Sequence, residues 1–288
     1  MIDAHHHLWN LSAVRYPWLE EKSVMRFFGD PTAIQKNYLV NDFQADCQSH
    51  GFRGSVHIQV GAKDPIEEAI WIDDITKNHP DWHMKQVVFC DLTKPEMLSE
   101  IEKLEKLPSV AGVRQILSRA PGKEAGSVFL DNIASPIVLK NLKILSRQGY
   151  TFDLQLIPEA MGQASLLFEK VPELKVALCH AGSPHDRTKE GIKYWQKELK
   201  LLSSLSNVTC KISGLGMFKH NWTIEDFRPI IEICLDQFGS NRCMFGSNFP
   251  VDSLYSDYNS LMSAFRTLIP KSSHETIFKN TACQFYSM

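Results

Sequence analysis

The sequence has no segment that points to a membrane or to nucleic acid. Its 288 residues contain no uninterrupted apolar run of the length a membrane-spanning helix needs, about 18 residues. Lysine and arginine total 31 against 33 acidic residues, which gives a net charge of −2, and no basic block stands out. We therefore expect neither partner, and we expect a small-molecule substrate. No feature of the sequence indicates an oligomeric state.

Paired cysteines are also missing. The seven cysteines stand singly, their number is odd, and no two have Cys-x-x-Cys spacing. This pattern is typical of reduced, buried thiols and predicts a cytoplasmic protein. No basic segment followed by an apolar one precedes the first predicted strand, so we do not expect a signal peptide.

The glycine-rich fingerprint of an open dinucleotide-binding sheet is absent after the first strand, which disfavours an open doubly wound sheet. The chain instead alternates short runs rich in Val, Ile and Leu with amphipathic stretches. Continuous apolar runs are typical of parallel strands buried on both faces. A barrel of alternating strands and helices needs about 250 residues. We predict one α/β domain over 1–288, a (β/α)8 (TIM) barrel, with strands in 2–7, 54–60, 83–92, 110–117, 150–157, 174–182, 207–216 and 242–252.

Two helix starts are predicted from capping residues. Asp64 before Pro65 predicts an N-cap followed by proline at the first helical position. Thr93 and Glu96 have the spacing of a capping box, which predicts a helix from that point to about Leu107.

Three consecutive histidines lie in the first predicted strand, IDAHHHLWN. Alternate side chains of a strand face the same side, so His5 and His7 converge while His6 points toward the helices. Two imidazoles on one strand suit zinc or another divalent ion. The alternative is a remnant of a purification tag, which is disfavoured because the run leads directly into hydrophobic sequence.

Polar residues end several of the other apolar strands, where the chemistry of such barrels lies. Polar groups inside a barrel are costly unless they are paired or used. Arg114 is the best candidate to hold a substrate carboxylate or hydroxyl cluster, because its planar fork suits oxygen pairs. Arg119 and Arg187 are weaker candidates. The further candidates for substrate contact are His57, Gln59, Asp153 and Gln155, and His180 is a candidate for catalysis and metal binding.

Some of these side chains have alternatives that the sequence leaves open. His57 and Gln59 contact substrate or form buried hydrogen bonds, and Lys211 can pair with Asp153. An aromatic segment follows the first strand and forms either a wall of the active site or a hydrophobic plug. Its aromatic residues are Trp9, Trp18, Phe27 and Phe28.

Six motifs spread over nearly the whole chain carry a family resemblance: DAHHHLW, GVRQIL, FDLQL, CHAG, KISGLG and FGSNFP. In this order they resemble the amidohydrolase superfamily, and more narrowly its amidohydrolase-related branch of sugar-lactone and pyrone-dicarboxylate lactone hydrolases. The resemblance implies a hydrolase that opens a lactone. It also implies that His5, His7 and His180 bind one divalent ion, zinc or manganese, or surround the reacting carbonyl without a metal.

The sequence departs from the family pattern at three places. Arg114-Gln115 and Gln155 stand where metal-richer relatives have ligands, which argues against two metals. Asn248 replaces the aspartate that usually activates water, and a carboxamide cannot take a proton from water. Either Asp252 is the base, or His180 or a first-strand histidine is the base while Asn248 orients the water, or the chain only binds. A decarboxylase of the same group is a further alternative.

Overall fold

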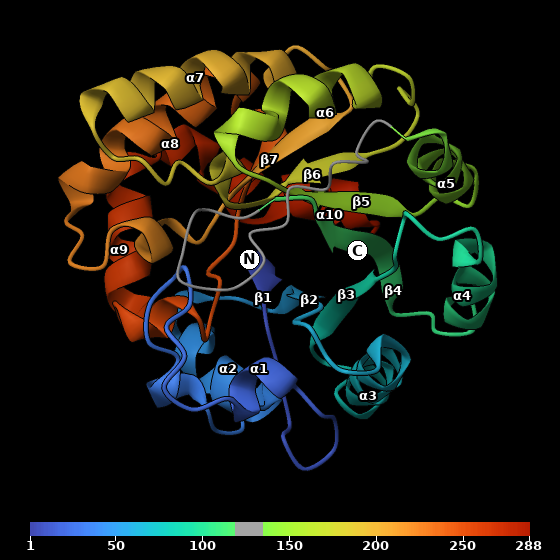
Figure 1. The fold of residues 1–288 in the computed structure, drawn as a ribbon. Helices are drawn as coiled ribbons and strands as arrows, with labels where there is room; N and C mark the ends of the chain where they lie inside the picture. Colours follow the sequence, from blue (N-terminus) through green and yellow to red (C-terminus); the bar gives the residue numbers. More distant parts are fainter. Residues whose placement is uncertain (119–134) are drawn as a thin grey trace.

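The computed structural model describes residues 1–118 and 135–288. Eight parallel strands follow one another in sequence order around a nearly closed barrel (Figure 1). Backbone hydrogen bonds of 2.7 Å from Asn248 N to His5 O and from His7 N to Phe249 O join the last strand's end to the first. The predicted (β/α)8 architecture is confirmed. The strands are β1 Ile2–His6, β2 Gly54–Ile58, β3 His83–Phe89, β4 Val110–Ile116, β5 Thr151–Gln155, β6 Val176–Leu178, β7 Val208–Ile212 and β8 Cys243–Phe245.

Helices surround the strands (Figure 1). Their starts test the capping predictions: the Asp64 side chain accepts a hydrogen bond from Ile66 N, as expected, but the capping box at Thr93 is wrong. Thr93 N and Oγ1 both bond to Asp91 Oδ1. The helices are α1 Pro17–Glu20, α2 Val40–Cys47, α3 Pro65–Asn78, α4 Met97–Leu104, α5 Pro136–Arg147, α6 Met161–Phe168, α7 Lys189–Ser203, α8 Ile224–Phe238, α9 Tyr258–Leu268 and α10 Thr281–Tyr286.

Two apolar clusters make up the core. The larger one lies between strands and helices, whereas the smaller one fills the barrel with side chains from five strands and α10. The C-terminal helix α10 lies across the barrel behind the strands (Figure 1) and adds Ala282, Phe285 and Tyr286 to the smaller cluster. One end of the barrel is thus filled with side chains, which leaves the other end for a site.

Strand β1 contains a β-bulge. Asp3 pairs with Ser55, but the next pair is His6 with His57, so β1 has one residue more than β2 between these pairs. Because of the extra residue, the inward-facing side changes from Ile2 and Ala4 to His5 and His7. His6 stacks on Phe43 of α2, with ring centroids 3.9 Å apart, on the helix side as predicted.

Two further expectations concern the chain as a whole. All seven cysteines are free and six of them are buried, as the unpaired pattern predicts. None of the helices in the described part of the chain has both the length and the apolar character that a membrane crossing requires. Arg119 lies outside the described residues.

Candidate active site

A cavity of about 540 Å³ lies at the C-terminal ends of the strands. Six of the ten side chains predicted for the site line it: His7, Gln59, Arg114, Gln155, His180 and Asn248. The other four, His5, His57, Asp153 and Asp252, lie behind or beneath this lining. The contacts of each group show what it can contribute.

His7 has a defined tautomer. Its Nδ1 lies 2.8 Å from the carbonyl oxygen of Ile58, and a carbonyl only accepts, so Nδ1 carries the hydrogen. Burial, with the nearby charge of Arg114, lowers the pKa of His7 to about 3. The ring is therefore neutral at pH 7, and its Nε2 presents a lone pair.

That lone pair faces another acceptor. Oδ1 of Asn248 lies 3.3 Å from His7 Nε2, while Asn248 Nδ2 donates to Asp252 Oδ1 at 3.0 Å. Two acceptors at this distance repel unless a proton or a cation lies between them. Otherwise the amide turns, its NH2 group donates to Nε2, and Asp252 must carry a proton that it donates to Oδ1. The orientation of Asn248 is thus linked to charge on both sides.

Asp252 lies behind Asn248. It is 3% exposed, and burial raises the pKa of its carboxyl to about 7. Its carboxylate contacts the Asn248 amide and is not part of the cavity lining, so Asp252, one of the candidates for the base, does not reach the cavity directly. The short link from Asn248 to Asp252 is a turn closed by a hydrogen bond from Asp252 N to Asn248 O, and it begins with Asn248 in the left-handed region at φ 60°, which asparagine tolerates.

His180 is held by an unusual turn at the end of β6. His180, Ala181 and Ser183 all have φ between 52° and 54°, a region that costs roughly 1–2 kcal/mol per non-glycine residue. Its Nδ1 lies 3.0 Å from Ser213 Oγ of the chain after β7. Gly214 makes room for the ring, since a Cβ there would be 2.5 Å from Nδ1. Hydrogen bonds from His180 N to Ser213 Oγ and from Ser183 N to His180 O hold this turn, in which the imidazole lines the cavity.

His5 lies between the other two imidazoles. Its ring centroid is 4.5 Å from that of His180 and 5.2 Å from that of His7. It is fully buried, and neither ring nitrogen has a hydrogen-bond partner. Burial, with the repulsion that a second proton on neighbouring His180 would cause and the charge of Lys211, holds its pKa well below the usual value, so the ring is neutral. A buried, unpartnered imidazole next to two others fits a ligand or ion at this point.

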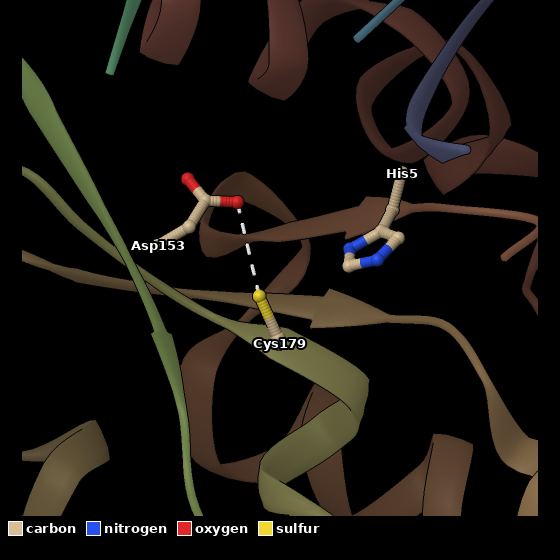
Figure 2. Close-up of side chains that lie close together, drawn as sticks. All are labelled: His5, Asp153 and Cys179. Carbon is tan, nitrogen blue, oxygen red and sulfur yellow. Dashed lines mark hydrogen bonds between the residues drawn. The ribbon is translucent and has the colours of Figure 1, made fainter. Parts of the chain in front are cut away.

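The donor atoms of these three histidines are nevertheless not all close together. Among the described residues, only His5, Asp153 and Cys179 bring three donors of this kind within 4.8 Å of one another (Figure 2). Burial raises the pKa of Cys179 to about 12, so its sulfur is a thiol, whereas a metal needs the thiolate. This group therefore offers an ion a place only if Cys179 loses its proton.

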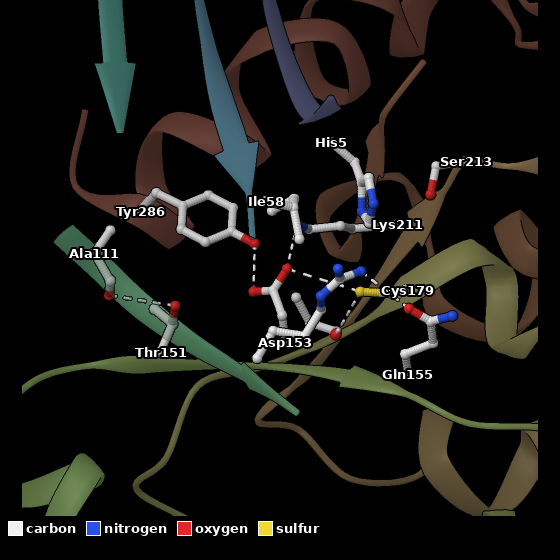
Figure 3. Close-up of polar contacts among 12 residues, drawn as sticks. His5, Ile58, Ala111, Thr151, Asp153, Gln155, Cys179, Lys211, Ser213 and Tyr286 are labelled. Carbon is white, nitrogen blue, oxygen red and sulfur yellow. Dashed lines mark hydrogen bonds and ion pairs between the residues drawn. The ribbon is translucent and has the colours of Figure 1, made fainter. Parts of the chain in front are cut away.

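Both carboxylate oxygens of Asp153 already have partners (Figure 3). Lys211 of β7 forms a buried ion pair with it, as the sequence analysis allowed, and Tyr286 donates to its other oxygen at 2.8 Å. Cys179 Sγ lies 3.7 Å from the oxygen that Lys211 contacts. Asp153 thus belongs to the barrel interior beneath the cavity. Lys211 and Tyr286 of α10 satisfy its carboxylate there.

Arg114 ties three strand ends together. Its Nη1 donates to Gln155 Oε1 at 3.0 Å, and its Nη2 donates to the backbone oxygen of Gln59. The side chain is buried but contributes to the cavity lining. A guanidinium fixed on two sides presents its positive charge to the cavity in one orientation.

The side chains of His57 and Gln59 lie in different surroundings. His57 Nδ1 accepts a hydrogen bond from Leu8 N, just after β1, at 3.1 Å. Its Nε2 lies 3.5 Å from Glu68 Oε1 of α3. Gln59 follows the end of β2 and lines the cavity. Of the two alternatives for His57, the structure shows the buried contacts. Glu68 was missed because a glutamate in an amphipathic helix looks solvent-exposed.

The segment after β1 forms part of the cavity wall. Trp18, Phe27 and Phe28 line it, and Trp18 Nε1 donates to Val60 O at 2.6 Å. Trp9 lies deeper, fully buried against Trp18. Arg187 does not line the cavity, and its Nη2 donates to Leu215 O. Sequence reasoning missed the cavity-lining residues Glu21, Arg26, Phe89, Ile116, Met217 and Val251.

Barrel, cavity and histidine cluster together define an amidohydrolase-type site. The amidohydrolase family model matches residues 2–288, and the chain belongs to that family. It is 34% identical to the uncharacterised protein y4mH of Sinorhizobium fredii, over 99% of this chain and 98% of that one. It is 23% identical to an L-fucono-1,5-lactonase of Burkholderia multivorans, over 91% and 86%. A Burkholderia multivorans amidohydrolase crystallised with zinc has a similar fold, with a TM-score of 0.83, 20% identity and coverage of 100% and 99%.

Proposed function

We propose that this protein is a hydrolase that opens a lactone by attack of water on the ring carbonyl. The observation that carries the proposal is the neutral His7, whose Nε2 lone pair lies beside Asn248 in a cavity shared with His180 and Arg114. The similarity to curated lactonases supports it. The family resemblance favours a sugar-acid or dicarboxylate lactone. The free cysteines support a cytoplasmic location.

The proton of the attacking water goes to a group on the cavity, and the same group then gives it to the ring oxygen, which leaves as a hydroxyl when the ring C–O bond breaks. His7 Nε2 is the acceptor whose tautomer is fixed, and Asn248 is beside it to orient the water. Asp252 has a pKa better matched to a base, but it reaches the cavity only through Asn248. Arg114 supplies positive charge for the carboxylate that forms when the ring opens.

Part of the histidine cluster offers free ligand atoms for one divalent ion, although the ring nitrogens of the three histidines would have to come closer together to share it. His5 has two orphaned ring nitrogens, and His7 Nε2 and Asn248 Oδ1 are two acceptors that face each other. With His180, these residues would hold zinc or manganese, and a bound ion acts as a Lewis acid that lowers the pKa of water. The hydrogen bond from His7 Nδ1 to Ile58 O would orient that ligand.

The test combines metal content with turnover. We expect untagged protein, purified without chelator, to hydrolyse at least one lactone of a panel that covers sugar-acid, dicarboxylate and alkyl-substituted rings, and His7→Ala to lose that activity. About one zinc or manganese per chain would indicate the metal version, and activity without metal the histidine version. Failure on the entire panel, with and without added zinc or manganese, would refute the proposal.

Two other functions remain as alternatives to this proposal. A decarboxylase would release carbon dioxide from an aromatic or dicarboxylic acid, and a gas-release assay on the same preparation tests it. A barrel that only binds is favoured by Asn248, and it would bind lactones without opening them. The intact His5, His7 and His180 favour an enzyme.

A further inference from the structure

The cavity lining contains both polar and apolar side chains. His7, Asn248, His180, Arg114 and Gln155 form its polar end, where His7 contacts Asn248 and Arg114 contacts Gln155. Apolar side chains come from the segment after β1, which also adds Glu21 and Arg26, from the ends of β2, β3 and β4, and from the chain after β7 and β8. This apolar wall consists of Pro17, Trp18, Phe27, Phe28, Val60, Phe89, Ile116, Met217 and Val251.

Within residues 1–118 and 135–288, the apolar wall is not fully covered by other side chains. Phe89 and Ile116, at the ends of β3 and β4, are half-buried, whereas Met84, Val87 and Val88 of β3 are buried. Pro17, Trp18, Phe27 and Val60 are half-buried as well. Apolar side chains left partly exposed inside a concave site are typical of a surface that a ligand covers.

Most polar groups near this wall already have partners. Gln115 uses its oxygen for Leu92 N and its NH2 group for Asp91. Gln59 Oε1 accepts from Gly61 N, and Glu21 pairs with Arg26. Every hydroxyl of a polyhydroxylated ring needs a partner when it is buried. The described residues offer such partners mainly at the polar end, where the carbonyl reacts.

The cavity also has space beyond a single ring. A volume of about 540 Å³ lies within the range of sites that hold drug-sized ligands. A lactone with its carbonyl beside His7 and Asn248 would leave the apolar wall uncovered unless the ring carries a substituent. The substituent would then lie against Trp18, Phe27 and Ile116.

We propose that the preferred substrate is a lactone bearing an alkyl or aryl substituent, which covers the apolar wall while the ring carbonyl lies at the polar end. This inference rests on the proposed lactone hydrolysis and narrows its substrate class. It favours an amphipathic lactone over the polyhydroxylated sugar-acid lactones and the dicarboxylate lactones that the family resemblance favours.

The experiment compares δ-valerolactone, its 5-alkyl derivatives of increasing chain length, and glucono-δ-lactone. We expect kcat/KM to rise about fourfold for each of the first few methylene groups, the value for burying one CH2. The longer alkyl lactones should exceed glucono-δ-lactone. A flat alkyl series, or higher kcat/KM for glucono-δ-lactone, would overturn the inference.

Two variants test whether the apolar wall causes the preference for alkyl-substituted lactones. Ile116→Asn should lower the ratio of kcat/KM for the pentyl-substituted to the unsubstituted ring by tenfold or more. Leu166→Asn is the matched control, because Leu166 is 62% exposed on α6 and does not line the cavity. Its ratio should equal that of the wild type. An unchanged ratio in Ile116→Asn contradicts the placement of the substituent.

A binding measurement distinguishes failure of this inference from failure of the proposed hydrolase function. If no lactone is opened, the hydrolase proposal fails, and calorimetry with 4-alkylcyclohexanones still tests the wall. These ketones should bind the wild type more tightly as the alkyl chain grows, and Ile116→Asn should lose that trend. Absence of binding by every ketone would refute the inference even if sugar lactones were hydrolysed.

Discussion

His5 and His6 are chemically identical neighbours with opposite surroundings. Both are fully buried and neither has a hydrogen-bond partner for its ring nitrogens. His5 lies between two other imidazoles of the site, whereas His6 is stacked on Phe43 among helix-side residues. Their contribution to function should therefore differ although their burial is the same.

Replacing each by phenylalanine tests this difference. His6→Phe keeps a ring against Phe43 and removes two unpartnered nitrogens, so we expect a free energy of unfolding higher by about 1 kcal/mol and full activity. His5→Phe should fold and lose activity at least a hundredfold. Urea unfolding and lactone hydrolysis measure the two effects. Equal loss of activity in both variants would show that the bulge in β1 does not separate their roles.

Asp252 gives the reaction a predicted pH dependence. Burial raises its pKa to about 7, and its ionised form holds the Asn248 NH2 group and keeps Oδ1 toward His7. When Asp252 gains a proton, the amide can turn and its NH2 group occupies the His7 lone pair. We expect kcat/KM to fall as the pH drops through about 7.

Asp252→Asn separates this positioning role from a role as base. An asparagine oxygen accepts from Asn248 at every pH, so the variant should keep activity within about tenfold of the wild type and lose the pH dependence between 6 and 8. A loss of activity at all pH values would instead make Asp252 the base. Rates of metal-loaded and chelator-treated protein should be compared at each pH.

The barrel elements were predictable because each strand is a short apolar run with its own boundary signals. The bulge in β1 was not predictable, because the order of apolar and polar residues in IDAHHH does not show where the strand has an extra residue. Nor did the sequence show that the C-terminal helix α10 packs across the barrel and adds side chains to its interior. Its residues look like an ordinary amphipathic end, and their burial follows from the small side chains Ala4 and Ala177 that leave room.

The contact between α10 and the barrel should contribute to the stability of the protein. Tyr286 donates a hydrogen bond to Asp153, so Tyr286→Phe leaves one oxygen of a buried carboxylate without a partner. We expect a loss of about 1.5–3 kcal/mol in the free energy of unfolding, the range for hydrogen bonds to charged groups. Tyr194→Phe, an exposed tyrosine of α7, is the control and should change stability by less than about 0.5 kcal/mol. Similar values for both would mean that Lys211 alone satisfies Asp153.

The candidate site was predictable where a residue ends a strand and faces inward. His7, Arg114, Gln155 and His180 follow that rule, and they line the cavity. Asp153 and His57 obey the same sequence pattern but go elsewhere, because their partners Lys211 and Glu68 are set by strand pairing and helix packing. The apolar wall was predicted only in part, since half-buried strand-end residues such as Phe89 and Ile116 look like ordinary core.

Four buried neutral histidines should make the whole protein sensitive to acid. Burial holds the pKa of each well below 6.5, so below that pH the unfolded chain binds protons that the folded chain does not. Stability is then complete above pH 6.5 and is lost as the pH falls; for His7, whose folded pKa is about 3, the loss is roughly 2 kcal/mol at pH 5. The four are His5, His6, His7 and His180.

Two buried carboxyls act in the opposite direction. Asp3 and Asp252 have pKa values raised to about 6 and about 7, so acidification relieves a cost of charge burial that the folded protein carries at pH 7. Between pH 7 and 5 this gain is about 4 kcal/mol for the two together, against roughly 2 for His7 and further losses in the same direction from His5, His6 and His180. We expect a net loss, because four histidines oppose two carboxyls, visible as a lower urea midpoint at pH 5 in the presence of a chelator. His6→Phe should make that loss smaller. A midpoint that is unchanged or higher at pH 5 would show that the histidines are protonated inside the folded barrel.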